Sequence, residues 1–175
     1  MPSLRDYLEF KQGKLAKLAE HLRQSDTPAI PLQVTARVAG GSGVRPVQIR
    51  EFTLVTDSGD GLAGYNLGPT SPELLLASLA SCLAHTYLIV ATQHNITYDR
   101  LEVRVAAEID FRGILEIEGA PSIAPYNLHY TAQIESPASD AELAAVQQAV
   151  EQLCPIFLAV TQPLPVTGEV VRLTS

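Results

Sequence analysis

Two cysteines are the residues of this 175-residue chain with the clearest capacity for chemistry. Cys82 lies in a long apolar stretch, four residues before Thr86 and on the same helical stripe. Cys154 ends a second helical pattern, four residues after Val150 and directly before Pro155. Taken singly, each is a small buried hydrophobic residue, since free cysteine is among the most buried residue types. If the two helices bury their apolar faces against each other, the two sulfur atoms meet, and such a pair is a candidate redox dithiol.

Histidine adds little to this chemistry. The two cysteines and the histidines show no spacing typical of metal ligands, so we expect neither a metal nor a cofactor. The four histidines are His21, His85, His94 and His129. His85 stands three residues after Cys82 and could contact it on one helix face. A buried, hydrogen-bonded histidine is the favoured interpretation of His85, ahead of a catalytic base.

Composition narrows the class of protein. Hydrophobic residues make up 46% and charged residues 18%, which indicates a globular domain with a sizeable core. The net charge of −7 and the scattered basic residues argue against a nucleic-acid partner. The charged N-terminus has no apolar signal-peptide region. Residues 74–91 approach the length of a membrane span, but their hydroxyl groups and the absence of a second span favour a core helix. We therefore expect a cytoplasmic protein without a membrane partner, in a compartment where thiols stay reduced.

The sequence predicts that both cysteines lie on helices that alternate with pairs of strands. Helices are predicted at 4–24, 72–94 and from 140 onward, and strands at 32–38, 45–56, 99–110, 127–136 and 165–173. Strands that come in pairs indicate an α+β fold with antiparallel sheet. The breaker segment 26–31 separates an N-terminal helical extension, residues 1–30, from a main domain, residues 31–175. The extension is expected to pack on the domain or on a partner subunit.

Local signals fix the ends of two helices. Ser71 is predicted as the N-cap of the long helix, with Pro72 first and Glu73 complementing the helix dipole. Asn95 can end that helix. Ser139 opens the later helix with a capping box, and Pro155 is expected to stop it or restart it at a kink.

The segment 68–74 (GPTSPEL), the Leu/Ala/Ser-rich helix with Cys82, and the Cys154–Pro155 pair about seventy residues later together resemble the OsmC/Ohr family, named for osmotically inducible protein C and organic hydroperoxide resistance. The resemblance covers about residues 32–175, including the segment 110–113 (DFRG), and leaves out the N-terminal extension. It implies an intertwined α+β homodimer with two long central helices, curved antiparallel sheets and active sites at the subunit interface.

The same resemblance implies an activity. Family members reduce organic hydroperoxides through a cysteine pair, in which the residue matching Cys82 attacks the peroxide and the residue matching Cys154 resolves it as a disulfide. A dithiol, such as a lipoylated protein, restores both thiols. Only a thiolate attacks, so Cys82 needs a depressed pKa, for which a nearby guanidinium is best suited.

The resemblance also implies two supporting residues, an arginine and a glutamate. We predict Arg50 as the guanidinium, with Arg45 next and Arg37 a further candidate; an exposed strand charge is the alternative for each. Glu73 is the candidate acid, although it stands nine residues before Cys82, about 13 Å along a regular helix and on the opposite face. Glu73 would therefore act on the partner's cysteine or serve only the helix dipole.

Two other functions compete with a thiol peroxidase. A non-catalytic ligand-binding or stress-associated dimer of the same fold would leave the thiols unused, although such a protein has no need of Cys154. A hydrolase with Cys82 as nucleophile lacks a convincing Cys/His/Asp arrangement.

Overall fold

One long apolar helix, α2 (Ser71–His94), organises the chain in the structure, a computed structural model that describes residues 3–25 and 29–173. The Thr70 side chain accepts the Glu73 N–H, and the Glu73 carboxylate accepts the Thr70 N–H, which makes a complete capping box. The N-cap is thus Thr70 and not Ser71 as predicted, because the acidic residue that completes the box stands three positions after Thr70. Asn95, with φ 55°, ends the helix as expected.

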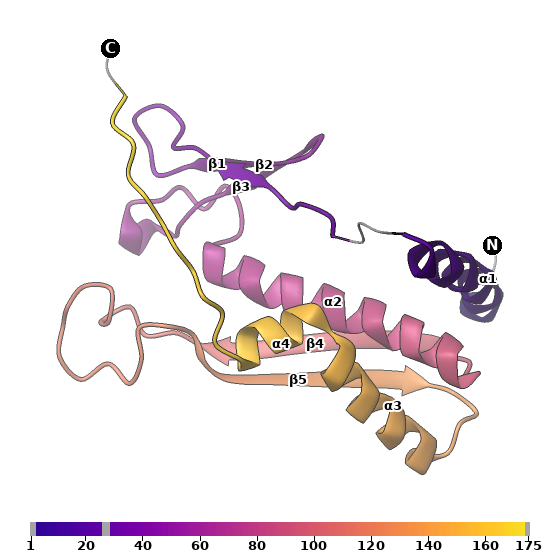
Figure 1. Cartoon of the computed structure of the whole chain (residues 1–175). Helices are drawn as coiled ribbons and strands as arrows, with labels where there is room; N and C mark the ends of the chain where they lie inside the picture. Colours follow the sequence, from indigo (N-terminus) through magenta and orange to yellow (C-terminus); the bar gives the residue numbers. More distant parts are fainter. Residues whose placement is uncertain (1–2, 26–28, 174–175) are drawn as a thin grey trace.

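The body of the fold is α2 packed on an antiparallel hairpin and on a broken helix (Figure 1). The hairpin is formed by β4 (Arg100–Glu108) and β5 (Tyr126–Glu135), with a bulge between Ala106 and Glu108. Helix α3 (Asp140–Leu153) begins with the predicted capping box, and α4 (Pro155–Thr161) follows at an angle of 70°. The strands predicted over 99–110 and 127–136 and the kink predicted at Pro155 are confirmed.

The core lies where α2, the hairpin and α3 meet. Its buried members include two tyrosines, branched aliphatic side chains and one of the two cysteines, namely Leu79, Leu83, Tyr87, Val90, Ala91, Tyr98, Val146, Val150 and Cys154. These residues come from α2, the loop that follows it and the end of α3, so their burial fixes how α2 and α3 face each other.

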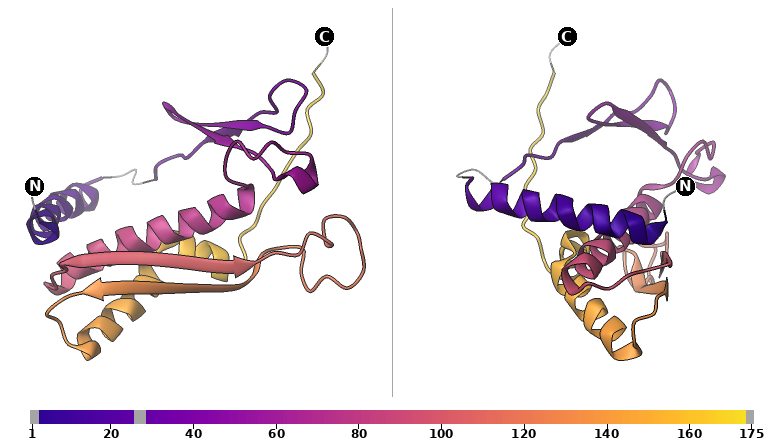
Figure 2. Two further views of the ribbon diagram at one scale, coloured as in Figure 1. Left: turned by 180° about the vertical axis from the view of Figure 1, so that it is seen from behind. Right: turned by 90° about the vertical axis from the view of Figure 1, so that its right-hand side faces the viewer.

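A second, three-stranded sheet stands on the other side of α2 from the hairpin (Figure 1, Figure 2). It comprises β1 (Val34–Ala36), β2 (Arg45–Ile49) and β3 (Phe52–Thr56), antiparallel in that order. The single strand predicted over 45–56 is wrong: the chain turns at Arg50 and Glu51, and Ile49 pairs with Phe52. Arg50 takes a left-handed backbone with φ 52° without being glycine or asparagine, so no turn residue marked this position.

Helix α1 (Leu4–Arg23) crosses the C-terminal part of α2, as Figure 2 shows from the side. Leu8 is buried against the core, so the extension packs on its own chain, one of the two arrangements expected from the sequence. The predicted linker 26–31 lies partly outside the described residues.

The C-terminal segment is extended but forms no strand with any described residue. The strand predicted over 165–173 is therefore wrong for the single chain. The segment leads away from the domain (Figure 1), and Val170 is fully exposed. A strand exists only with a hydrogen-bonded neighbour, and among the described residues no strand edge pairs with this segment.

Helix α2 is long and apolar enough to span a membrane by length and composition. Its contacts with β4, α1, α3 and α4 are those of a core helix, although only one face is buried. The predicted core helix is covered on one face only within one chain, since residues such as Leu75, Ser78 and Ser81 are exposed.

Candidate functional site

Cys82 lies near the middle of α2, on the boundary between its buried and its exposed face. Leu83 and Thr86 beside it are buried, while Ser81 is open to solvent. The Thr86 hydroxyl donates to the Cys82 carbonyl at 2.8 Å, which anchors this turn of the helix. Cys82 is thus half-buried, as a thiol that meets both a core partner and an incoming substrate must be.

Cys154 stands at the joint between α3 and α4. Its N–H donates to the Val150 carbonyl at 2.8 Å and closes α3, while its extended backbone makes it the N-cap of α4. Pro155 then begins α4, because proline fits the first turn of a helix but not its interior. The joint turns Cys154 inward, and its side chain is completely buried.

The structure brings the two thiols together. Cys82 packs against the core cluster that contains Cys154, and the Cys154 thiol and the backbone N–H of Ile156 are both among the groups that act on the Cys82 thiol. Both cysteines are free thiols. The pairing predicted from the helical stripes is thus present before any disulfide forms.

The pKa of Cys82 is raised above its ordinary value. Desolvation is the main cause, and the neighbouring Cys154 thiol adds to it, whereas the Ile156 N–H and the Thr86 hydroxyl pull the pKa down less strongly. The single chain therefore holds Cys82 as the thiol, and a thiolate needs a positive charge from elsewhere.

An open depression of about 510 Å³ gives access to Cys82. Small and polar side chains of α2 form most of it, with one apolar residue of α4. Its lining is Ala77, Ser78, Ser81, Cys82, His85 and Ile156. A small molecule can therefore reach Cys82, whereas Cys154 is buried and does not line the depression.

Arg50 is not part of this lining. Its guanidinium carbon lies 5.3 Å from the centre of the Phe52 ring, at the tip of the β2–β3 hairpin. Arg45 donates to the Gly43 carbonyl at 2.5 Å, and Arg37 is exposed beside β1. Within the described chain, none of the three arginines is among the groups that act on the Cys82 thiol.

Glu73 is occupied by the helix cap. Its Oε2 accepts the N–H and the hydroxyl of Thr70 at 2.7 and 2.8 Å. The N–H of Thr70 is the main cause of a lowered pKa, so Glu73 is a carboxylate near neutral pH. Glu73 is not brought to its own Cys82, in agreement with the nine-residue spacing.

Sequence reasoning missed Lys11. This lysine lies on the buried face of α1, and its Nζ is 3.0 Å from Nε2 of His85 in the depression beside Cys82. The one available signal was its spacing, because Lys11 occupies the position that continues the apolar stripe of Leu4 and Leu8.

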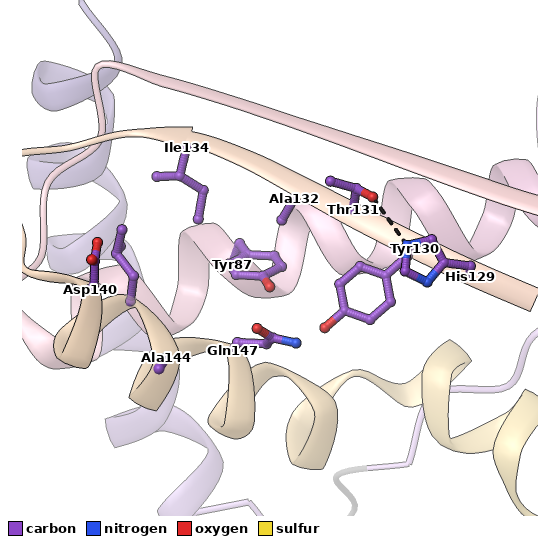
Figure 3. Close-up of a pocket in the computed structure, with 10 residues that line it drawn as sticks. Tyr87, His129, Tyr130, Thr131, Ala132, Ile134, Asp140, Ala144 and Gln147 are labelled. Carbon is purple, nitrogen blue, oxygen red and sulfur yellow. Dashed lines mark hydrogen bonds between the residues drawn. The ribbon is translucent and has the colours of Figure 1, made fainter.

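A separate cavity of about 570 Å³ lies between β5 and α3 (Figure 3). Tyr87 and Tyr130 point into it, and the Tyr130 hydroxyl donates to Glu151 at 2.6 Å. Burial is the main cause of a raised Tyr130 pKa, so this tyrosine stays protonated at neutral pH. Neither cysteine lines this cavity, and among residues 3–25 and 29–173 no three His, Cys, Asp or Glu side chains gather to hold a metal ion.

The fold is α+β, and it brings a half-buried Cys82 of α2 together with a buried Cys154 at the end of α3. The chain belongs to the OsmC-like protein family, whose model matches residues 63–169. The match begins after α1 and the three-stranded sheet, and it includes both cysteines. A comparison with curated proteins gives no match.

Solved structures support the same fold. An OsmC-like protein from Mycoplasma pneumoniae is 19% identical, with 78% of this chain and 89% of that chain covered and a TM-score of 0.64. An organic hydroperoxide resistance protein OsmC from Legionella pneumophila is 15% identical, with 77% and 91% covered and a TM-score of 0.56. An organic hydroperoxide resistance protein from Elizabethkingia anophelis is 19% identical, with 78% and 91% covered and a TM-score of 0.54.

Proposed function

We propose that this chain is a thiol-dependent peroxidase that reduces organic hydroperoxides in an oxidative stress response. The observation that carries the proposal is the contact between a half-buried Cys82 at an open depression and a fully buried Cys154. Hydroperoxide resistance among structures of the same fold supports the choice of substrate class.

The reaction follows from thiol chemistry. The Cys82 thiolate attacks the terminal oxygen of the hydroperoxide, the O–O bond breaks, and Cys82 becomes a sulfenic acid while the alkoxide takes a proton and leaves as an alcohol. The Cys154 thiol then attacks the sulfenic sulfur, which forms the disulfide and releases water. A dithiol such as a lipoylated protein reduces the disulfide and is itself oxidised.

Burial of Cys154 suits this second step. A completely buried thiol does not compete for the peroxide, but it is already beside the sulfenic acid when that acid forms. Apolar side chains around the pair, such as Leu79 and Ile156, favour alkyl hydroperoxides over hydrogen peroxide.

A homodimer would complete the site. Large apolar side chains are exposed on the three-stranded sheet and the C-terminal segment, including Val34, Phe52, Val166 and Val170. Exposed apolar area of this extent is typical of an interface. The unpaired C-terminal segment also fits a strand that pairs with a second copy. We assign Arg50 and Glu73 to the partner's Cys82, and we place the reaction in the cytoplasm, where dithiols stay reduced.

A non-catalytic ligand-binding dimer is the second candidate. One observation favours it: the single chain raises the pKa of Cys82, whereas a peroxidase needs the thiolate. The two functions differ in turnover, since only the peroxidase consumes hydroperoxide repeatedly.

A coupled assay with cumene hydroperoxide and dihydrolipoamide tests the proposal. We expect repeated turnover by the wild type and none by Cys82→Ser. Cys154→Ser should retain the first reduction of peroxide but lose most of the turnover, because its sulfenic acid over-oxidises. Consumption by the wild type at the rate of Cys82→Ser would refute the peroxidase and leave the ligand-binding dimer.

A further inference from the structure

Helix α1, which the family match does not include, is firmly docked on α2 and the loop after it. Arg5 forms a two-point ion pair with Asp99, at 2.6 and 2.7 Å. The Gln12 amide donates to the Thr92 carbonyl at 3.2 Å and to the Asn95 side chain at 3.0 Å. Leu8, between these contacts, is only 3% exposed. An ion pair, two amide hydrogen bonds and a buried leucine therefore fix the orientation of α1 on α2.

This docking buries a lysine beside the cysteine site. Lys11 is 8% exposed, and its Nζ lies 3.0 Å from Nε2 of His85. Its ammonium also stands 5.7 Å from the centre of the Tyr7 ring. Within the described part of the chain, no carboxylate lies at ion-pair distance from Lys11. Burying an ammonium without a carboxylate is costly, so its place against His85 calls for a role.

The contact sets the tautomer of His85. A lysine ammonium can only donate, so Nε2 of His85 accepts and Nδ1 carries the proton. Desolvation first and the charge of Lys11 second lower the pKa of His85, so the ring is neutral at pH 7. The ring lines the same depression as Cys82, one helical turn away.

We propose that Lys11 and His85 form a proton relay for the peroxide reduction, a proposal that rests on the peroxidase function above. As Cys82 takes the terminal oxygen, the departing alkoxide accepts the proton from Nδ1 of His85, while Nε2 takes a proton from Lys11. The alkoxide leaves as a neutral alcohol, His85 stays neutral in its other tautomer, and the lysine amine regains its proton from water. His85 is thus a catalytic proton donor and Lys11 its positioning and recharging residue.

The leaving group separates this relay from a structural role. A tertiary alkyl hydroperoxide releases an alkoxide, which is a strong base and needs a proton as it leaves. A peracid releases a carboxylate, which is a weak base and needs none. We therefore compare oxidation of Cys82 by tert-butyl hydroperoxide and by peracetic acid in stopped-flow experiments. The variants are Lys11→Met and His85→Gln, with Lys17→Met, an exposed lysine of the same helix, as the matched control.

With tert-butyl hydroperoxide, we expect His85→Gln to lower the second-order rate constant about 100-fold, the lower end of the range of general acid catalysis, and Lys11→Met to lower it less, about tenfold, because Lys11 acts through His85. With peracetic acid, both variants should match the wild type, and Lys17→Met should match it with both oxidants. Equal losses with both oxidants, or no loss with either, would overturn the relay. His85 is exposed, so His85→Gln tests the relay even if Lys11→Met disturbs docking. A wild type that is inert to tert-butyl hydroperoxide contradicts the peroxidase itself, and the relay falls with it.

Discussion

The thiols of Cys82 and Cys154 lie close enough to interact although the residues stand 72 positions apart in the chain. Two structural facts produce the contact: α3 packs on α2, and the joint at Pro155 turns the end of α3 inward. Because the two thiols already interact in the reduced protein, we expect a disulfide to form between them without a rearrangement of the helices.

Subunit complementation tests whether Arg50 acts across the proposed dimer interface. We expect Arg50→Ala to slow oxidation of Cys82 at least about tenfold, because the thiol pKa is raised without a nearby cation. A purified heterodimer of a Cys82→Ser chain and an Arg50→Ala chain then has one native site and should regain about half of the wild-type rate, as symmetry requires.

The matching control is a heterodimer in which Arg45→Ala replaces Arg50→Ala. Arg45→Ala alone is expected to leave oxidation near the wild-type rate. Its heterodimer with the Cys82→Ser chain should therefore show no gain per intact Cys82, whereas the Arg50→Ala chain should gain rate on pairing. If the Arg50→Ala heterodimer stays as slow as its Arg50→Ala parent, Arg50 does not act in trans. A slow Arg45→Ala homodimer that recovers on mixing would transfer the role to Arg45.

Asp57 should give the fold a pH-dependent stability. Its buried carboxylate accepts the N–H groups of Ser58 at 2.7 Å, Tyr65 at 2.9 Å and Leu67 at 3.2 Å. The bond from Ser58 is the main cause of its lowered pKa. A depressed folded pKa stabilises the protein above the unfolded value of about 3.9, and this stability is lost as pH falls through the folded value.

We therefore expect Asp57→Asn to lower the melting temperature at pH 7, with a difference from wild type that shrinks below about pH 4. Thermal unfolding followed by circular dichroism measures both. The exposed Asp60→Asn is the control and should change little. A difference that is constant from pH 7 to pH 3 would show that the Asp57 charge does not stabilise this loop.

Local signals in the sequence predicted much of this fold. Ser139 and Glu142 lie three residues apart, so their capping box is visible in the sequence and is present in the structure. The order of paired strands and helices was likewise sufficient for the α+β class. By contrast, Arg50 takes a left-handed backbone conformation in a turn, and arginine is not a residue type that marks such a turn. The single strand predicted over 45–56 is therefore two strands in the structure.

Long-range features were harder to predict. The strand expected at 165–173 has the right composition, but composition does not supply a neighbouring strand. Likewise, the contact of Lys11 with His85 joins residues 74 positions apart. In the sequence alone, Lys11 is indistinguishable from the solvated lysines of the same helix. The Cys82–Cys154 pair was predictable only because helical stripes on both sides pointed inward and Pro155 marked the joint.

The most direct test of the central claim is titration of the reduced protein with cumene hydroperoxide, followed by alkylation of free thiols and mass spectrometry. One equivalent of peroxide per chain should remove both free thiols, and a digest should contain a single peptide pair joined by a Cys82–Cys154 disulfide within one chain. Two alkylated thiols after an excess of peroxide would contradict the account.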